Sequence, residues 1–96
     1  MNGLIGRIEA KTGEATALAE LLVDSVAGLP GCRSYVVAID AENPDSIWVT
    51  EVWESQEHHQ ASLSLPAVAE AIGKGRPMIA GFSARHETQV VGGHGV

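Results

Sequence analysis

The sequence predicts one α+β domain in which a single antiparallel sheet carries its helices on one face. Residues 47–53 form an alternating strand that contains both tryptophans, and alternation turns Trp48 and Trp53 to opposite faces. Residues 14–27 carry apolar side chains at helical spacing. A turn cluster at 42–45 separates the tryptophan strand from the apolar run before it. The resulting order, strand–helix–strand–strand–helix–strand, is typical of a ferredoxin-like four-stranded sandwich.

The first half of the chain supplies a strand, a helix and a second strand. Residues 4–10 contain alternating apolar positions, which indicates a strand. In residues 14–27 the leucines recur three and four residues apart, and the Gly-Leu-Pro-Gly segment at 28–31 ends this helix. Residues 33–40 are rich in β-branched side chains, so we expect them to pair with 47–53 as an antiparallel hairpin.

The second half supplies a helix in two pieces and a last strand. Helical spacing resumes at Ser55, directly after the tryptophan strand. Pro66 begins the second helical piece, because proline is favoured in the first turn of a helix. This piece is expected to end near Gly73 or Gly75, and residues 78–90 form the last strand.

Length, charge and hydropathy exclude several classes of protein. The 96 residues suffice for one domain, which we place at 1–90, with a flexible Gly-rich tail over 91–96. The net charge of −6 argues against nucleic-acid binding, and no apolar run approaches the ~20 residues of a membrane span. Arg7 and Glu9 interrupt the first apolar segment and argue against a signal peptide, so we expect a cytoplasmic protein. Cys32 has no internal disulfide partner; a small buried hydrophobe is the favoured interpretation, and a reactive thiol is the alternative.

The two faces of the tryptophan strand also predict an assembly. The helices of such a sandwich cover one face of the sheet, so Trp48 and Val52 on the other face need a second apolar surface. Packing two sheets face to face in a two-fold homodimer covers them, which would give a dimeric α+β barrel. At about 25 cal/mol per Å², a few hundred Å² of apolar area per subunit would contribute several kcal/mol.

Several segments together resemble a known family over nearly the whole chain. They are the opening LIGRIEAKTGEATALAELL, the turn LPGCRSY into the second strand, the strand end VWESQEHH, and SLPAV further into the helix. In this order and spacing they are similar to the antibiotic biosynthesis monooxygenase superfamily. The resemblance implies small ferredoxin-like dimers, many of which oxidise phenols, quinols or anthrone-like polyketides with molecular oxygen and no cofactor. Relatives of the same fold bind and degrade haem, and others have no demonstrated chemistry.

The chain departs from two patterns of these relatives. Many members carry a histidine nine residues after the strand tryptophan, where this chain has Ser62, and its histidines are His58 and His59. The positions that correspond to the asparagine and iron ligand of the haem-degrading relatives are Gly6 and Ser62. Serine is a poor ligand for haem iron, so haem degradation is disfavoured, although His59 could serve as a shifted ligand.

A cofactor-free oxygenase needs an apolar pocket, a general base and a donor that steadies developing negative charge. No nucleotide, flavin or metalloprotease motif is visible, and we expect no cofactor and no metal. Trp53, on the helix-facing side, is either a pocket wall or part of the core. Glu51 shares that face and needs a partner or a raised pKa; it either contacts substrate or pairs with an arginine such as Arg85.

The histidines divide by position. His58 and His59 point about 100° apart on a helix and cannot chelate one metal together. Spacing with Leu63 turns His59 toward the sheet, where it is a candidate general base or a hydrogen-bonded core residue; Leu63 itself would be an apolar wall. His58 is expected in solvent. His86 on the last strand is a further catalytic candidate that could join the same pocket or the barrel interior, and His94 lies in the tail.

Two further residues are candidates for substrate binding. Tyr35 could present its hydroxyl to a substrate or pack in the sheet, and Arg76 could bind an anion at a pocket mouth or be a solvated turn residue. Two other classes of function stay open beside the monooxygenase. One is a non-catalytic module that binds a small molecule, and the other is a dimerisation domain in which Trp53 is core and no cavity remains.

Overall fold

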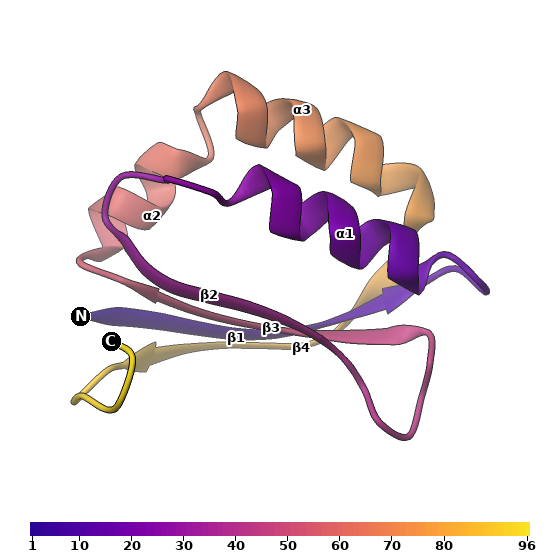
Figure 1. Ribbon diagram of the computed structural model, residues 1–96, viewed down its shortest axis with the longest axis horizontal. Helices are drawn as coiled ribbons and strands as arrows, with labels where there is room; N and C mark the ends of the chain where they lie inside the picture. The colour runs from indigo at the N-terminus through magenta and orange to yellow at the C-terminus, as the bar shows by residue number, and fades with distance from the viewer.

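The computed structural model describes residues 1–96, and it contains four strands, three α-helices and one short 3₁₀ turn (Figure 1). None of the helices combines the length and the apolar character needed to cross a membrane. In chain order the elements are β1 (Asn2–Ala10), α1 (Ala15–Ser25), β2 (Cys32–Ile39), β3 (Ser46–Trp53), α2 (Gln56–Ser62), α3 (Pro66–Gly75), the 3₁₀ turn η1 (Arg76–Met78) and β4 (Ile79–Gln89).

The four strands form one antiparallel sheet with the order β2–β3–β1–β4. All three helices lie over the same face of this sheet, with α1 and α3 side by side along it and α2 at one end (Figure 1). The predicted ferredoxin-like α+β fold is therefore confirmed. The second helix is indeed divided, and Pro66 is at the first position of α3, where its missing N–H costs no hydrogen bond.

The densest packing lies at one end of the sandwich. Leu18 of α1 and Ile47 of β3 are almost completely buried, and they contact the apolar residues where β1 ends. Trp53 is equally buried, but it stands at the opposite end of β3, opposite Asn2 in the register. The core cluster consists of Ile8, Ala10, Ala15, Leu18, Ile47 and Val49.

The outer face of the sheet, which carries no helix, is less apolar than expected. Trp48 does lie on this face, opposite to Trp53, but its Nε1 donates to Asp40 Oδ2 at 2.7 Å and the Arg7 guanidinium lies 5.5 Å from its ring centroid. Val52 is only 8% exposed within the single chain, so the expectation that it needs a partner to cover it is wrong. The side chain that stands open here is Val36 of β2, which is opposite Thr50 and 54% exposed.

Candidate functional site

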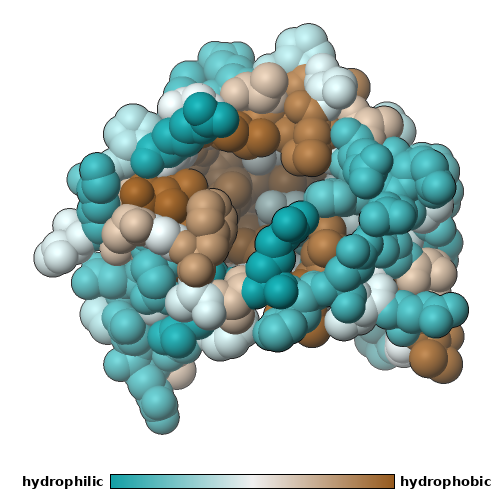
Figure 2. Space-filling view, turned by 180° about the vertical axis from the view of Figure 1, so that it is seen from behind, coloured by the Kyte–Doolittle hydropathy of each residue, from teal (hydrophilic) through white to brown (hydrophobic).

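A cavity of about 500 Å³ lies between the sheet and the helices. Its walls come from α1, α2, α3 and the helix-facing side of the sheet, and most of them are apolar. Leu63, the predicted apolar wall, lines it together with Leu18 and Leu22 of α1. Seen from the side of β4, the molecule has a hollow lined by hydrophobic residues with hydrophilic residues around its rim (Figure 2). The cavity therefore opens between α3 and β4.

A smaller pocket of about 140 Å³ adjoins this cavity. The two share the side chains of Tyr35, Glu51, His59 and Phe82, together with Ile8. These shared residues include every ionisable group that the main cavity holds except Arg76. The ionisable groups of this mostly apolar space are thus concentrated where the two pockets meet.

Three side chains form a contact cluster in that place. The Trp53 indole Nε1 donates a hydrogen bond to Glu51 Oε1 at 3.0 Å. His59 Nε2 lies 3.8 Å from the same oxygen, and the His59 ring meets the Trp53 ring edge-on with centroids 5.4 Å apart. The side chains of His59 and Glu51 are only 14% and 16% exposed. Trp53, His59 and Glu51 are therefore held together by direct contacts; we refer to them as the cavity triad.

Local sequence explains why His59 faces inward. Ser55 is the N-cap of α2, and its hydroxyl accepts from the His58 backbone N–H at 3.2 Å, which fixes where the helix begins. Ser62, one turn after His59, is buried, and its hydroxyl donates to the His59 carbonyl at 2.6 Å. His59, Ser62 and Leu63 then share the helix face over the sheet. The predicted inward orientation of His59 is confirmed.

Burial controls the acid–base properties of the site. Loss of hydration raises the pKa of Glu51 above its usual range, and the Trp53 hydrogen bond and the charges of His59 and Arg85 offset only part of this effect. Burial, together with the nearby Glu51 and Cys32, also raises the pKa of Tyr35, so its hydroxyl stays protonated and can donate. Burial and Glu51 raise the pKa of Cys32 as well, which fits a half-buried apolar residue better than a reactive thiol.

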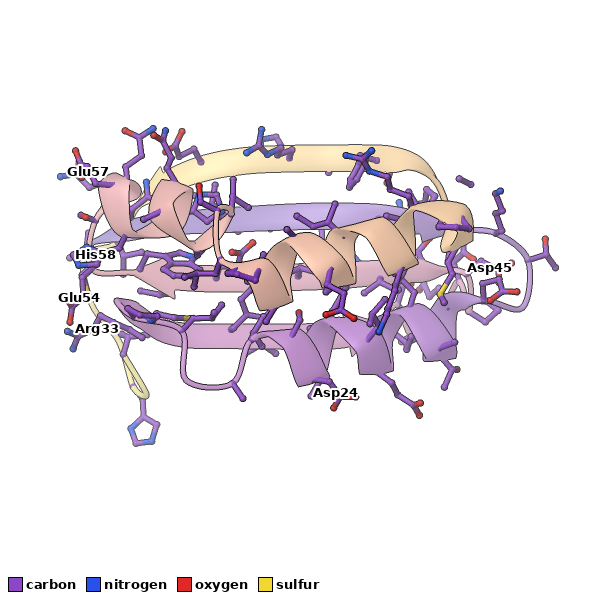
Figure 3. All side chains as sticks on the ribbon, turned by 90° about the horizontal axis from the view of Figure 1, so that it is seen from above. Asp24, Arg33, Asp45, Glu54, Glu57 and His58 are labelled. Atoms are coloured by element: carbon purple, nitrogen blue, oxygen red, sulfur yellow. The ribbon has the colours of Figure 1, made fainter.

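Two other histidines lie away from the cavity. His58 is exposed at the end of the sheet beside Glu54 and Arg33 (Figure 3), its Nδ1 is 2.6 Å from the Ser55 hydroxyl, and its ring covers Gly31. His86 is exposed and pairs with Ile5 in the register, so it lies on the outer face of the sheet. Of the two places expected for His86, the cavity is wrong, because strand alternation turns His86 away while Arg85 faces inward. The other, the interior of a dimeric barrel, stays a prediction, since the outer face is the one that such a dimer would enclose.

A bulge in β4 decides which of its side chains reach the cavity. Arg7 pairs with Ala84 but Ile8 pairs with Phe82, so one extra residue is accommodated in β4. Phe82 and Arg85 consequently both border the pockets, although strict alternation would place residues three apart on opposite faces. Sequence analysis missed Phe82 for this reason. Arg85 makes no ion pair with Glu51, so that proposed pairing is wrong; the polar contacts of Glu51 are Trp53 and His59.

The remaining candidates are placed as follows. Arg76 follows α3 and lines the main cavity with an exposed side chain, and Tyr35 lines both pockets from β2.

Sequence analysis missed the inward face of α3. The spacing of three and four residues between its members could have revealed it; they are Val68, Ala71, Ile72 and Gly75.

No three His, Cys, Asp or Glu side chains converge in a way that could hold a metal ion. The residue at the position of the haem ligand in relatives, Ser62, already donates its hydroxyl to the His59 carbonyl and offers no imidazole. The residues present at that position therefore do not fit a haem iron.

Taken together, the open antiparallel sheet, the helices on one face and the apolar cavity with a polar cluster define a small α+β protein with a candidate site for a ligand. The family model for antibiotic biosynthesis monooxygenase matches residues 1–74. The chain belongs to this family, and its resemblance in sequence to the family is confirmed.

Solved structures agree with this assignment. A crystal structure named "putative Antibiotic biosynthesis monooxygenase" from Chloroflexus aurantiacus J-10-fl is 55% identical, with a TM-score of 0.95, over 97% of this chain and 95% of that chain. A protein of the same description from Deinococcus radiodurans is 24% identical, with a TM-score of 0.80 and the same coverage. Another from Caulobacter crescentus CB15 is 17% identical, with a TM-score of 0.84 over 95% and 90% of the two chains. The last two show the fold alone. No curated protein matches this chain.

Proposed function

We propose that this protein is a cofactor-independent monooxygenase that oxidises an electron-rich aromatic compound, such as a quinol, phenol or anthrone, with molecular oxygen. The observation that carries the proposal is the cavity triad on the wall of a 500 Å³ apolar cavity. Membership of the family, whose name describes a monooxygenase, supports it. The cavity itself favours a ligand-binding role over a purely structural one, because a dimerisation domain needs no such space.

The apolar walls suit an aromatic substrate. Leu63, Ile72 and Phe82 border the cavity and are 48%, 41% and 68% exposed, so three large apolar side chains stand in water around its opening. An aromatic ligand would cover them, which is favourable by about 25 cal/mol for each Å² of apolar surface removed from water. The phenolic end of the substrate would lie at the cavity triad, where the polar groups are.

His59 is the proposed base. Its neutral imidazole would accept the proton of the substrate hydroxyl or acidic C–H, and the imidazolium so formed would be stabilised by the Glu51 carboxylate 3.8 Å from Nε2. The Trp53 N–H donates to the same carboxylate and holds it in place. Tyr35 would donate its hydroxyl to the oxygen atom on which negative charge develops.

The chemistry balances without a further reductant. The substrate anion transfers one electron to O₂, and the resulting radical and superoxide combine to form a C–O bond. Proton transfer and loss of water from the peroxide then leave a carbonyl. For an anthrone, a CH₂ group and O₂ become a C=O group and H₂O, so the substrate supplies all the electrons.

Oxygen uptake tests the proposal. Purified protein without flavin, haem or metal should consume oxygen with an anthrone or naphthoquinol. His59→Ala should lower turnover by about 10²–10⁴-fold, the usual effect of losing a general base, while circular dichroism stays unchanged. His58→Ala is the matched control, since it removes the adjacent imidazole that lies outside the cavity. Full activity of His59→Ala would leave the non-catalytic binding module as the better interpretation, and activity only with added haem and reductant would favour the haem relatives.

The assembly is a proposal as well. We infer that two copies pack through the outer face of the sheet to form a dimeric α+β barrel, because the helices cover only the other face (Figure 1). Val36 and the partly exposed Ile5 and Trp48 would be covered in this interface.

A further inference from the structure

We propose that the substrate is an elongated aromatic carboxylate, with its anionic group bound by Arg76 at the end of the cavity remote from the cavity triad. This inference rests on the proposed function for the identity of the reacting ring, but the anion site is tested by binding alone. Four observations support it, namely the ion pairing of the arginines, the distribution of polar groups in the cavity, the separation of Arg76 from the cavity triad along the sheet, and the position of the opening.

The arginines divide into paired and unpaired ones. Arg7 lies 3.3 Å from Glu9, and Arg33 lies 3.9 Å from Glu54. Arg76 and Arg85 form no ion pair in the chain, although the protein is acidic, with a net charge of −6. Both unpaired arginines border the pockets, Arg76 the main cavity and Arg85 the smaller one. A guanidinium beside an apolar cavity binds planar anions well, since its N–H groups match the geometry of a carboxylate.

The two unpaired arginines are not equivalent. The positive charge of Arg85 favours the ionised form of Glu51 and so offsets part of the rise in pKa that burial causes. Arg85 thus has a nearby carboxylate that the protein itself supplies. Arg76 has no such neighbour: Lys74, two residues before it, pairs with Glu70 at 3.0 Å on the outside of α3. Arg76 is therefore the cation in the cavity wall whose counter-charge the protein does not provide.

The strand register fixes how far Arg76 lies from the reacting end. Glu51 is opposite Leu4 on β1, and Ile79, which begins β4 shortly after Arg76, is opposite Ala10. Six residues of β1 separate these levels, which corresponds to about 20 Å at ~3.4 Å per residue. Figure 1 shows α2 and the C-terminal end of α3 at opposite ends of the helix layer. After allowing roughly 6 Å for the reach of the arginine side chain, a ligand of about three fused rings with a terminal carboxylate would span the distance.

The opening of the cavity between α3 and β4 admits such a ligand lengthwise. Ile72 of α3 and Phe82 of β4 both line the cavity and are exposed, and so is Arg76, which directly follows α3. Ring surface would lie on the apolar side chains while the carboxylate stays near water at Arg76. A partly hydrated anion avoids most of the cost of burying charge.

Binding of a matched pair of redox-inert probes tests the inference. The pair is anthracene-2-carboxylate and the neutral anthracene-2-carboxamide, titrated into the full chain at low salt and followed by quenching of the emission of its two tryptophans. The carboxylate should bind about tenfold more tightly than the amide, as expected for a charge-assisted contact at a partly exposed site. Arg76→Gln should remove this preference by weakening the carboxylate and leaving the amide unchanged. Raising the salt concentration should reduce the preference in the same direction.

Control variants make the outcome specific. Arg33→Gln removes an arginine that is paired outside the cavity, and it should keep the full preference. Equal binding of acid and amide by the unmodified protein overturns the inference, as does a preference that survives in Arg76→Gln. Loss of the preference only in Arg85→Gln also overturns it, because the anion would then lie at the cavity triad. The binding measurements use no oxygen, so their outcome does not depend on the monooxygenase proposal. That proposal is contradicted separately, if neither quinols nor anthrones are oxidised.

Discussion

The hydrogen bond from Trp53 to Glu51 offers a sharp test of how the cavity triad is held together. Trp53→Phe keeps an aromatic ring but removes the indole N–H that donates to Glu51 Oε1 at 3.0 Å. A hydrogen bond to a charged group contributes about 1.5–3 kcal/mol. Trp53 is 1% exposed, and the loss of about three buried heavy atoms costs a further ~1–2 kcal/mol. We therefore expect the free energy of unfolding to fall by about 2.5–5 kcal/mol near pH 8.

The pH dependence of this loss follows from the ionisation of Glu51. Burial raises the pKa of Glu51 in the folded state, so its contribution to stability is greatest below the unfolded pKa and is lost as pH rises through the folded pKa. The Trp53 hydrogen bond limits that loss because it favours the carboxylate. Near pH 4 the carboxyl is largely protonated and accepts only a neutral hydrogen bond, which is weaker. The destabilisation by Trp53→Phe should accordingly be about 1 kcal/mol smaller at pH 4 than at pH 8.

Urea unfolding of four proteins measures the effect: the unmodified chain, Trp53→Phe, Glu51→Gln and the double variant. In the Glu51→Gln background the carboxylate is absent, so the extra cost of Trp53→Phe at pH 8 should disappear. The same cost in both backgrounds, or a cost that does not change with pH, would refute the reasoning. It would mean that Trp53 stabilises the protein by packing alone.

Two further predictions concern the turn before β2 and the outer face of the sheet. Gly31 has φ +76° and a Cβ there would overlap the His58 ring, so Gly31→Ala should lower the free energy of unfolding by about 2–3 kcal/mol, in part relieved by His58→Ala. Gly28→Ala, with φ +71° and open space around it, is the control and should cost about 1 kcal/mol in thermal or urea unfolding; equal costs at both glycines would contradict the packing of His58. Val36→Glu should weaken the proposed dimer by at least about 10²-fold in sedimentation experiments, because it buries an unpaired charge. Val23→Glu, at a position on α1 that is equally exposed (53% against 54%), should leave the dimer intact, whereas a monomeric unmodified protein would disprove the assembly.

Much of the fold and part of the site could be predicted from local patterns. Alternation in residues 46–53 placed Trp48 and Trp53 on opposite faces, and helical spacing with Leu63 turned His59 toward the sheet. Both predictions depend only on the periods of the strand and helix, which hold wherever an element is regular. Alternation fixes only that His86 and Arg85 lie on opposite faces of β4, and the pairing of β4 with β1 decides that His86 takes the outer one. Phe82 could not be predicted with the same rule, because the bulge between its pairs with β1 brings it inward.

The sequence by itself determined the class of fold, the division of the second helix at Pro66, and the family, since these depend on local periodicity, turn residues and the order of motifs. Only the tertiary structure decided the interactions of the cavity. Glu51 contacts His59 instead of pairing with Arg85 because the end of β3 meets the first turn of α2, a contact between elements that no residue spacing specifies. Val52 is buried and Val36 open on the same outer face for a similar reason, since exposure depends on which strands stand at the centre and which at the edge of the sheet.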